Sequence, residues 1–246
     1  MTTLKHPSLL HDDLISDVLL ADAPWAESHG ADPQNGYLGA GLLYYTLAYM
    51  LRAKLCVCIG SGGGFVPRLM RQAQRDLGLD DARTVLIDGN TGDWSRPQWL
   101  KEDSLFRKAY PEIEILLATS RDVSERRETR AWKIDYLHID GDHSHAGSLE
   151  DFQRFERLMS PRGLITFHDT KPYEYFNVTC WKTLADLRAE GYQAVDLPWI
   201  GCGTAVIAPG RSVRKPNPAR MLKRRYLQNF ISTILRRIKA GLSAPK

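Results

Sequence analysis

The sequence predicts a doubly wound α/β fold, built on a seven-stranded and mostly parallel sheet. Hydrophobic runs of strand length recur with helical stretches between them, which is the pattern of a parallel sheet covered by helices on both faces. The first run leads into a glycine-rich turn, and two later runs end in acidic and histidine residues. At 246 residues, with 43% hydrophobic and 25% charged residues, the chain has the size and composition of one large globular domain.

Seven runs have strand length, and four other stretches have helical periodicity. The expected strands are 55–59, 85–87, 113–117, 135–139, 164–167, 192–197 and 204–208. The expected helices are 42–51, 65–77, 149–158 and 181–190. Ser148 and Asp151 have the spacing of a capping box at the start of the third helix, and residues 160–163 are expected to end that helix.

The chain carries no sequence signal for a membrane or an oxidising compartment. No stretch approaches the roughly 18 apolar residues of a membrane span, and the first residues lack a secretory pattern, so we expect a cytoplasmic protein. The four cysteines lack C-x-x-C spacing and are expected to be core thiols; they are Cys56, Cys58, Cys180 and Cys202.

A glycine-rich turn, Gly60-Ser61-Gly62-Gly63-Gly64, follows the first strand and precedes a helix. Glycines let the backbone approach a ligand closely, and the helix offers free N–H groups, so such turns commonly receive nucleotide-like cofactors. A dinucleotide fingerprint would need glycine at the positions of Phe65 or Pro67. The spacing therefore argues against NAD, and a purely structural turn is the alternative.

Asp88 ends the second strand, where its carboxylate would accept hydrogen bonds from both ribose hydroxyls of a nucleoside cofactor. The alternative is that Asp88, Gly89 and Asn90 only form a turn, which these residue types favour for backbone reasons. We favour the ribose contact because Asp88 stands at the carboxyl end of a strand.

The densest polar cluster follows the fourth and fifth strands. Asp140, Asp142 and His143 come after the fourth, and His168 and Asp169 after the fifth. Neighbouring strand ends lie roughly 5 Å apart, and ligands bind outside them. Asp140 and Asp169, with His168 or water, would therefore hold a hard cation, Mg²⁺ or Mn²⁺. The alternative is that Asp142 caps its loop and His168 packs beneath the sheet.

Asp142 and His143 are then the candidates for a general base that removes a proton from a substrate hydroxyl. A bound cation would lower the pKa of that hydroxyl. His138 shares a strand face with Asp140 and is expected to be a core histidine with satisfied hydrogen bonds, whereas His145 is expected to be solvated.

With these motifs assembled, the chain resembles the class I S-adenosylmethionine-dependent methyltransferases, in particular the divalent-metal-dependent sugar O-methyltransferases. That group acts on macrolide and aminocoumarin sugars and on mycobacterial methylmannose oligosaccharides. The resemblance runs from about residue 37 to residue 208. It rests on the glycines at 60, 62 and 64, on Asp88, on the D-G-D-H run 140–143 and on the F-H-D run 167–169.

The resemblance implies a role for each motif. S-adenosylmethionine would contact Gly60, Ser61, Gly62, Gly64 and Asp88, with Ser120 near the adenine. Asp140 and Asp169 would hold Mg²⁺ or Mn²⁺, and Asp142 or His143 would be the base. Two positions depart from the family: Cys58 stands where many relatives have an acidic residue, and His168 where an acidic metal ligand is common.

Three segments are expected: an N-terminal helical region (1–50), a catalytic domain (51–210) and a basic tail (211–246). The catalytic domain would bind S-adenosylmethionine, and residues 34–41 of the N-terminal region would lie over the site as a lid. Eleven of the 33 Lys and Arg residues and no Asp or Glu fall in the tail, so the first 210 residues carry a formal net charge of −7. Residues 221–238 have the pattern of an amphipathic helix, whose apolar face would be buried against the domain or against a second subunit of a homo-oligomer, most simply a dimer. The alternatives are that the helix contacts a membrane surface, an acidic partner or nucleic acid.

The leading hypothesis is transfer of a methyl group to a hydroxyl of a sugar, an oligosaccharide or a glycosylated metabolite. A metal would orient the hydroxyl and a base would deprotonate it for in-line attack on the sulfonium methyl. The alternative is an RNA-binding or RNA-modifying protein anchored by the tail, although the sequence lacks an RNA-recognition motif. A non-catalytic scaffold is the third option.

Overall fold

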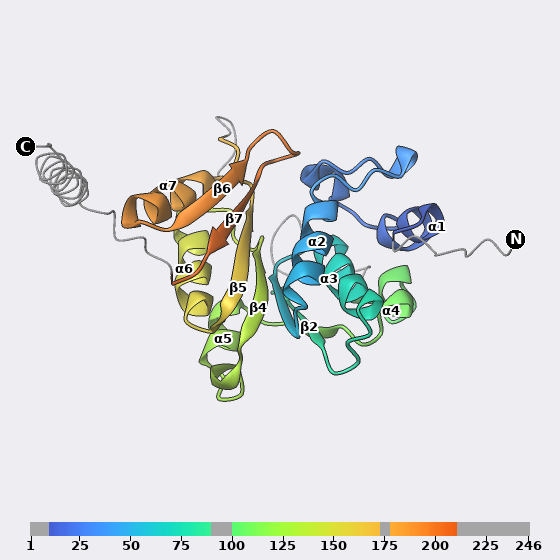
Figure 1. The fold of residues 1–246 in the computed structure, drawn as a ribbon, viewed down its shortest axis with the longest axis horizontal. Coiled ribbons are helices and arrows are strands. Elements are labelled where there is room, and N and C mark those ends of the chain that lie inside the picture. Colours follow the sequence, from blue (N-terminus) through green and yellow to red (C-terminus); the bar gives the residue numbers. More distant parts are fainter. Residues whose placement is uncertain (1–9, 90–99, 173–177, 211–246) are drawn as a thin grey trace, which may run out of the picture. The chain divides into compact units, whose positions relative to one another are not determined.

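A single seven-stranded sheet organises the chain. The structure, a computed structural model, describes residues 10–89, 100–172 and 178–210. The strand order is β3-β2-β1-β4-β5-β7-β6 (Figure 1). β7 runs antiparallel to both of its neighbours, and the other neighbouring strands are parallel. The prediction of a doubly wound, mostly parallel, seven-stranded α/β fold is confirmed.

The element bounds follow the sequence pattern closely. The strands are β1 (Leu55–Ile59), β2 (Arg83–Ile87), β3 (Glu114–Leu116), β4 (Ile134–Ile139), β5 (Met159–His168), β6 (Gln193–Leu197) and β7 (Thr204–Ala208). The α-helices are α1 (Asp12–Leu14), α2 (Gly41–Leu51), α3 (Phe65–Asp76), α4 (Leu105–Ala109), α5 (Ser120–Glu125), α6 (His145–Glu156) and α7 (Cys180–Glu190). Short π and 3₁₀ turns are η1 (Ile15–Leu19), η2 (Ala26–His29), η3 (Pro33–Asn35) and η5 (Thr129–Ala131).

Two details around α6 differ from expectation. Its N-cap is Ser144, whose Oγ accepts a hydrogen bond from the Gly147 N–H at 3.0 Å, so the capping box at Ser148 is wrong. Residues 160–163 do not form a break before β5 but belong to it. A shift in register between Ile134 and Tyr136 of β4 absorbs the Pro-Arg-Gly stretch that reads as a helix stop.

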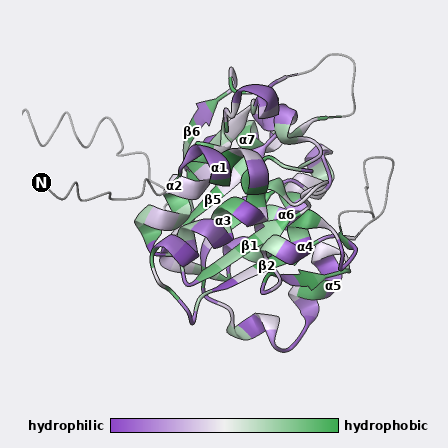
Figure 2. Ribbon diagram, turned by 90° about the vertical axis from the view of Figure 1, so that its right-hand side faces the viewer, coloured by the Kyte–Doolittle hydropathy of each residue, from purple (hydrophilic) through white to green (hydrophobic). Residues whose placement is uncertain are grey.

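The sheet separates two hydrophobic cores. Cys56 and Cys58 of β1 face the core shared with α2 and α3, whereas Val57 and Ile59 face the core shared with α6 and α7. Every residue of β1 is buried, as expected for a central strand covered on both faces, and the inner strands carry hydrophobic colours in Figure 2. All four cysteines are free thiols; three are buried and Cys202 is half-buried.

The N-terminal region is fastened to α3 by a buried arginine. The guanidinium of Arg68, which is 1% exposed, donates to the backbone carbonyls of Val18 at 3.1 Å, Ala21 at 2.5 Å and Asp22 at 3.0 Å. Because five donors in a fixed fork suit several carbonyls at once, one side chain holds a whole turn of chain. The residues that follow, 24–30, consequently lie against the glycine turn and the polar cluster.

Some predictions lie outside the described residues or are not tested by them. The tail 211–246 lies outside the described ranges, so its helix, its partners and an oligomeric state stay predictions. In the predicted lid, Leu38 and Ala40 are buried and Tyr37 is exposed, and the lid role also stays a prediction. Within the described ranges, no helix has both the length and the apolar character needed to cross a membrane.

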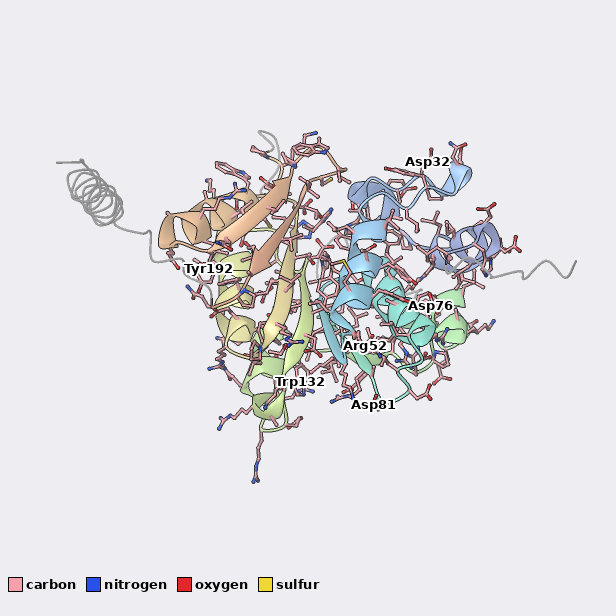
Figure 3. The ribbon with its side chains drawn as sticks, viewed as in Figure 1. Asp32, Arg52, Asp76, Asp81, Trp132 and Tyr192 are labelled. Carbon is pink, nitrogen blue, oxygen red and sulfur yellow. The ribbon has the colours of Figure 1, made fainter. Side chains whose placement is uncertain are left out.

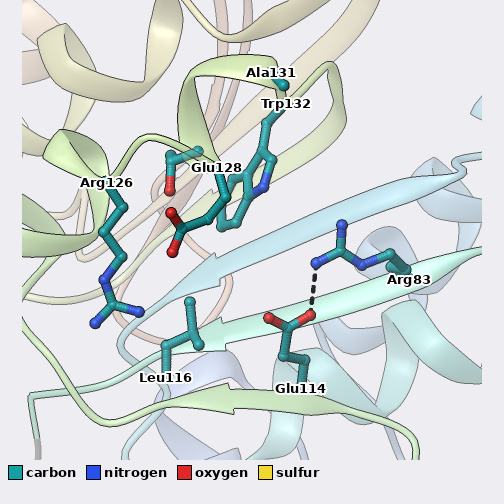
Figure 4. Close-up of a pocket in the computed structure, with 8 residues that line it drawn as sticks. Arg83, Glu114, Leu116, Arg126, Glu128, Ala131 and Trp132 are labelled. Carbon is teal, nitrogen blue, oxygen red and sulfur yellow. Dashed lines mark hydrogen bonds and ion pairs between the residues drawn. The ribbon is translucent and has the colours of Figure 1, made fainter.

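One surface pocket opens near the amino ends of β2 and β3. An ion pair between Arg83 and Glu114, 2.6 Å long, spans it (Figure 4). In Figure 3, Trp132 of this pocket lies at the same end of the molecule as Asp81, which precedes β2, and far from Asp32 of the N-terminal region. No residue of the predicted site lines this pocket. Ligands of such sheets bind at the opposite, carboxyl ends of the strands.

Candidate active site

The carboxyl ends of β1, β2 and β4 meet at the glycine turn. The Gly60 N–H donates to the Ile87 carbonyl, and the Asp140 N–H donates to the Ile59 carbonyl, each at 2.8 Å. Gly60 has φ +69°, and a Cβ added there would lie 2.2 Å from the Asp140 carbonyl oxygen. Only glycine fits both the backbone angle and the contact, so the turn is built directly against the polar cluster.

The Gly60→Ala variant is therefore expected to lose at least about 3 kcal/mol of unfolding free energy, since it combines a left-handed backbone with overlap of a neighbouring carbonyl. Gly78→Ala is the matched control, because Gly78 also has positive φ but nothing lies within 4 Å of its Cβ position. The control should lose about 1–2 kcal/mol. Urea unfolding of both variants measures the difference. Equal losses would show that the Asp140 carbonyl moves aside without a loss of unfolding free energy.

The other residues of the turn, from Ser61 to Gly64, pack against other parts of the protein. A Cβ at Gly62 would lie 2.6 Å from the Trp25 ring, and one at Gly64 would lie 2.8 Å from the Phe106 ring. The Oγ of buried Ser61 accepts a hydrogen bond from the Gly64 N–H at 2.8 Å, which closes the turn. The N-terminal region therefore forms one wall beside the turn. The cofactor contacts of these residues stay predictions.

Asp88 and Ser120 lie after β2 and β3. Asp88 is half-buried, and its N–H donates to the Leu116 carbonyl at 3.1 Å. The Ser120 hydroxyl donates a short hydrogen bond to the carboxylate of Asp151 on α6. Burial raises the pKa of Asp151 to about 6, and a Cβ at Gly141 would lie 3.2 Å from its Oδ2. Ser120 thus has a protein partner next to the D-G-D run, and its place near an adenine stays a prediction.

Four histidines surround the buried carboxylate of Asp140. Its oxygens lie 3.0 Å from His168 Nδ1, 3.6 Å from His29 Nε2, 3.8 Å from His138 Nε2 and 3.9 Å from His143 Nε2. The predicted convergence of Asp140 and Asp169 is also present, since one atom from each of Asp140, His143 and Asp169 lies within 4.8 Å of the others. The strand ends therefore bring Asp140, His143, His168 and Asp169 together.

The charges within this cluster are balanced by pairing. Burial lowers the pKa of His168, but the charge and hydrogen bond of Asp140 outweigh it and raise that pKa to about 9. Burial raises the pKa of Asp140, but the positive charge and hydrogen bond of His168 hold it well below its usual range. Burial keeps the pKa values of His29 and His138 below the ordinary value.

Each of the three buried histidines has one ring nitrogen held by the protein. His29 Nδ1 is hydrogen-bonded to the Tyr44 hydroxyl at 3.1 Å, and His138 Nδ1 to the Thr166 hydroxyl at 2.8 Å. His168 Nε2 donates to the Ser28 carbonyl at 3.1 Å. His138 Nε2 is buried without a hydrogen-bond partner, so the expectation of a fully satisfied core histidine is wrong.

His143 and Asp142 separate in the structure, although they are adjacent in sequence. His143 Nδ1 lies 2.5 Å from Asp169 Oδ2, and the ring is 35% exposed. Burial lowers the pKa of His143, but the Asp169 hydrogen bond and the two nearby carboxylates raise it above the ordinary value. Asp142 is exposed, and its Oδ1 accepts from the Ser144 N–H at 2.8 Å. It therefore caps the loop and lies apart from the cluster.

Two members of the cluster were not predicted as site residues. His29 comes from η2 in the N-terminal region, and nothing in its local sequence distinguishes it from a surface histidine. The sequence places His138 on the same strand face as Asp140. It does not show that Nε2 of His138 lacks a hydrogen-bond partner, because that depends on how β5 packs against β4. His145, in contrast, pairs with Asp186 at 2.8 Å and stands half-exposed beside the cluster, as expected for a solvated histidine.

The comparisons with known proteins assign this arrangement to a family. Residues 57–170 match a family described as a methyltransferase domain, a stretch that begins in β1 and ends two residues after β5. The stretch 57–170 is similar to a methyltransferase domain. The match includes the glycine turn, Asp88 and every cluster residue except His29. Together with the strand order, it supports the prediction of a class I S-adenosylmethionine-dependent methyltransferase.

Solved methyltransferases share the fold at low sequence identity. An O-methyltransferase from Bacillus cereus, in complex with SAH, is 15% identical, with a TM-score of 0.58 over 83% of this chain and 93% of that one. The O-methyltransferase TomG from Streptomyces achromogenes, in complex with SAM, is 16% identical, with a TM-score of 0.56 over 80% and 95%. The uncharacterized protein y4gI from Sinorhizobium fredii is 26% identical over 173 residues, which are 68% of this chain but 18% of that protein.

Proposed function

We propose that this methyltransferase transfers the methyl group of S-adenosylmethionine to a hydroxyl oxygen of a sugar, an oligosaccharide or a glycosylated metabolite. The observation that carries the proposal is the pair of His143 and Asp169 at the carboxyl ends of β4 and β5. The pair is adjacent to the glycine turn through Asp140, and its imidazole is the most accessible of the clustered histidines. A hydroxyl acceptor needs such a base, because its oxygen is a weak nucleophile while protonated.

The residues of the pair divide the work between them. Asp169 accepts the Nδ1–H of His143 and so fixes the tautomer that leaves Nε2 free to take a proton. The hydroxyl proton would pass to Nε2 while the oxygen forms a bond to the methyl carbon. The carbon–sulfur bond breaks in the same step, and S-adenosylhomocysteine leaves. Asp169 then stabilises the imidazolium that has formed.

S-adenosylmethionine is supported as the methyl donor by position. Gly60 and Asp88 stand at the ends of adjacent parallel strands, as a nucleoside cofactor requires. The solved relatives from Bacillus cereus and Streptomyces achromogenes have this fold and are titled as complexes with SAH and SAM. The proposal extends their ligand to this chain.

Mg²⁺ does not fit the donor set of this cluster well. Mg²⁺ and Mn²⁺ prefer oxygen ligands, and Mg²⁺ in particular demands six in near-ideal octahedral geometry. Here two carboxylates, those of Asp140 and Asp169, are outnumbered by imidazoles, and each already has a histidine partner within 3.0 Å. We therefore assign no step of the reaction to Mg²⁺.

The test is a methyl-transfer assay on the purified full chain with S-adenosylmethionine labelled in its methyl group. Calorimetry with S-adenosylhomocysteine first establishes cofactor binding, and failure of binding would overturn the proposal. Acceptors are free oligosaccharides, glycosylated metabolites and RNA. We expect label in the saccharides as an alkali-stable methyl ether. Transfer to RNA alone would instead support the alternative drawn from the basic tail. Chelator should leave the proton-transfer step intact.

A further inference from the structure

We propose that His29, Asp140 and His168 form a binding site for Zn²⁺ that fastens the N-terminal region to the catalytic sheet. This site differs from the predicted Mg²⁺ site in its cation and in the use of His29 in place of Asp169, while it shares Asp140 and His168, and it goes beyond methyl transfer itself. One carboxylate and two imidazoles make up its inner set of donors. Imidazole nitrogen suits Zn²⁺ and similar transition ions, whereas Mg²⁺ selects oxygen.

The three side chains converge on one point from distant parts of the chain. His168 Nδ1 is 3.0 Å and His29 Nε2 is 3.6 Å from different oxygens of Asp140. One ligand atom from each residue lies within 4.8 Å of the others, and the two imidazole rings are 3.9 Å apart. A tetrahedral Zn²⁺ ion with ligands at about 2.0–2.2 Å holds its ligand atoms roughly 3.3–3.6 Å apart, and the separations of 3.0 and 3.6 Å lie near that range.

The outer nitrogens of the two histidines have the anchoring that metal sites require. His168 Nε2–H donates to the Ser28 carbonyl, and this fixes Nδ1 as the nitrogen that faces the site. His29 Nδ1 is held by the Tyr44 hydroxyl, which is itself 2.6 Å from the Thr204 hydroxyl. Metal-bound histidines usually have such a partner for the other nitrogen, which sets ring orientation and tautomer.

His138 lies next to the triangle but outside it, since its ring is not among the donors that all lie within 4.8 Å of one another. It is 0% exposed, and its Nε2 has no hydrogen-bond partner although it faces Asp140 Oδ2 at 3.8 Å. A buried polar nitrogen without a partner is costly, so its retention points to a ligand. Water, or His138 after a shift of its ring, would supply the fourth ligand of a four-coordinate zinc site.

A second possible set of ligands shares Asp140 but is less suited to the ion. It uses His143 and Asp169, and His143 is 35% exposed. The inner histidines are 1% and 3% exposed, so their desolvation cost has already been met by folding. The inner site would also leave His143 available as the base.

The inner site would have a structural consequence for the cofactor cleft. His29 ends η2, and Trp25, which lies against the glycine turn at Gly62, immediately precedes that turn of helix. A zinc ion held by His29 and by residues at the ends of β4 and β5 would therefore fix this segment beside the turn. Metal binding of this kind contributes directly to folding free energy.

The experiment measures metal directly and needs no methyl-transfer assay, so its failure is separate from failure of the proposed function. The full chain is stripped with a chelator, reloaded with Zn²⁺ and desalted, and the Zn²⁺ that it retains is counted by mass spectrometry. Co²⁺ titration then reports the ligand field through visible absorption. We expect about one equivalent of Zn²⁺ and an intense, tetrahedral Co²⁺ spectrum. His29→Gln and His168→Gln should each weaken binding by at least about 100-fold.

The matched controls are His143→Ala and His145→Ala. His143 belongs to the second set of ligands, with Asp140 and Asp169, which we call the outer set. His145 pairs with Asp186 and belongs to neither set. Both should bind Zn²⁺ as the wild type does, and zinc should raise the unfolding temperature of the wild type but not of His29→Gln. Loss of the Co²⁺ spectrum in His143→Ala, with retention in His29→Gln, would overturn the proposal in favour of the outer set. Absence of Zn²⁺ from the wild type would overturn it altogether.

Discussion

The His143→Ala variant is expected to lose about 10²–10⁴-fold in the rate of methyl transfer, the range of a positioned general base. The ring lies 2.5 Å from Asp169 and 3.9 Å from Asp140, and its removal leaves the glycine turn and Asp88 in place. Binding of S-adenosylhomocysteine should therefore be unchanged. Calorimetry and single-turnover transfer on the same preparation separate the two effects.

Two neighbours on the same loop serve as controls for His143. His145→Ala removes a histidine that pairs with exposed Asp186, and Asp142→Asn removes a charge but keeps the oxygen that caps Ser144. Both variants should retain the rate within a few-fold. If Asp142→Asn lost as much activity as His143→Ala, the base would be Asp142 and not His143.

The pH profile of the wild type gives the same assignment an independent test. A general base works unprotonated, so the rate rises with pH through its pKa. Because Asp169 and Asp140 raise the pKa of His143, the rising limb should lie above the ordinary histidine value of about 6.5. Asp169→Asn removes one of these charges and should move the limb to lower pH as well as slowing the reaction.

The sequence was a good guide wherever a local pattern decides the structure. Continuous apolar runs predicted the central strands, because a strand buried on both faces tolerates no polar interruption. The convergence of Asp140 with Asp169 followed from the rule that neighbouring parallel strands end at one edge. The glycine spacing was also informative, since Gly60 is required by both its φ and the Asp140 carbonyl.

What the sequence could not supply were contacts made by tertiary packing. His29 joins the cluster only because buried Arg68 holds the chain before it onto α3, and no periodicity reports such an arrangement. Which of Asp142 and His143 is the candidate base depends on which side chain caps the loop before α6, and only the folded structure shows this. The strand β5 extends through a proline and a glycine for a similar reason, since pairing with β4 outweighs local propensity.

Asp140→Asn is expected to cost the metal-free protein about 3–5 kcal/mol of unfolding free energy at pH 6. The Asp140 carboxylate is the shared partner of four buried or half-buried imidazoles, and its replacement leaves protonated His168 with only the Asp169 carboxylate, which is 3.5 Å from Nδ1 and is itself paired with His143. Removing one member of a buried ion pair has this cost because the remaining charge stays desolvated. Urea unfolding in the presence of a chelator measures it, with exposed Asp142→Asn as the control at about 0.5 kcal/mol or less.

The pH dependence of this penalty distinguishes an ion pair from a packing effect. The pKa of His168 is raised to about 9, so its contribution is fully present below about pH 6.5 and is lost as pH rises through 9. The difference between a pKa of about 6.5 and one of about 9 corresponds to about 3 kcal/mol of unfolding free energy. The gap between wild type and Asp140→Asn should therefore shrink by about this amount between pH 6 and pH 10. Groups far from Asp140 titrate alike in both proteins and cancel, so an unchanged gap would mean that Asp140 acts through shape and neutral hydrogen bonds alone.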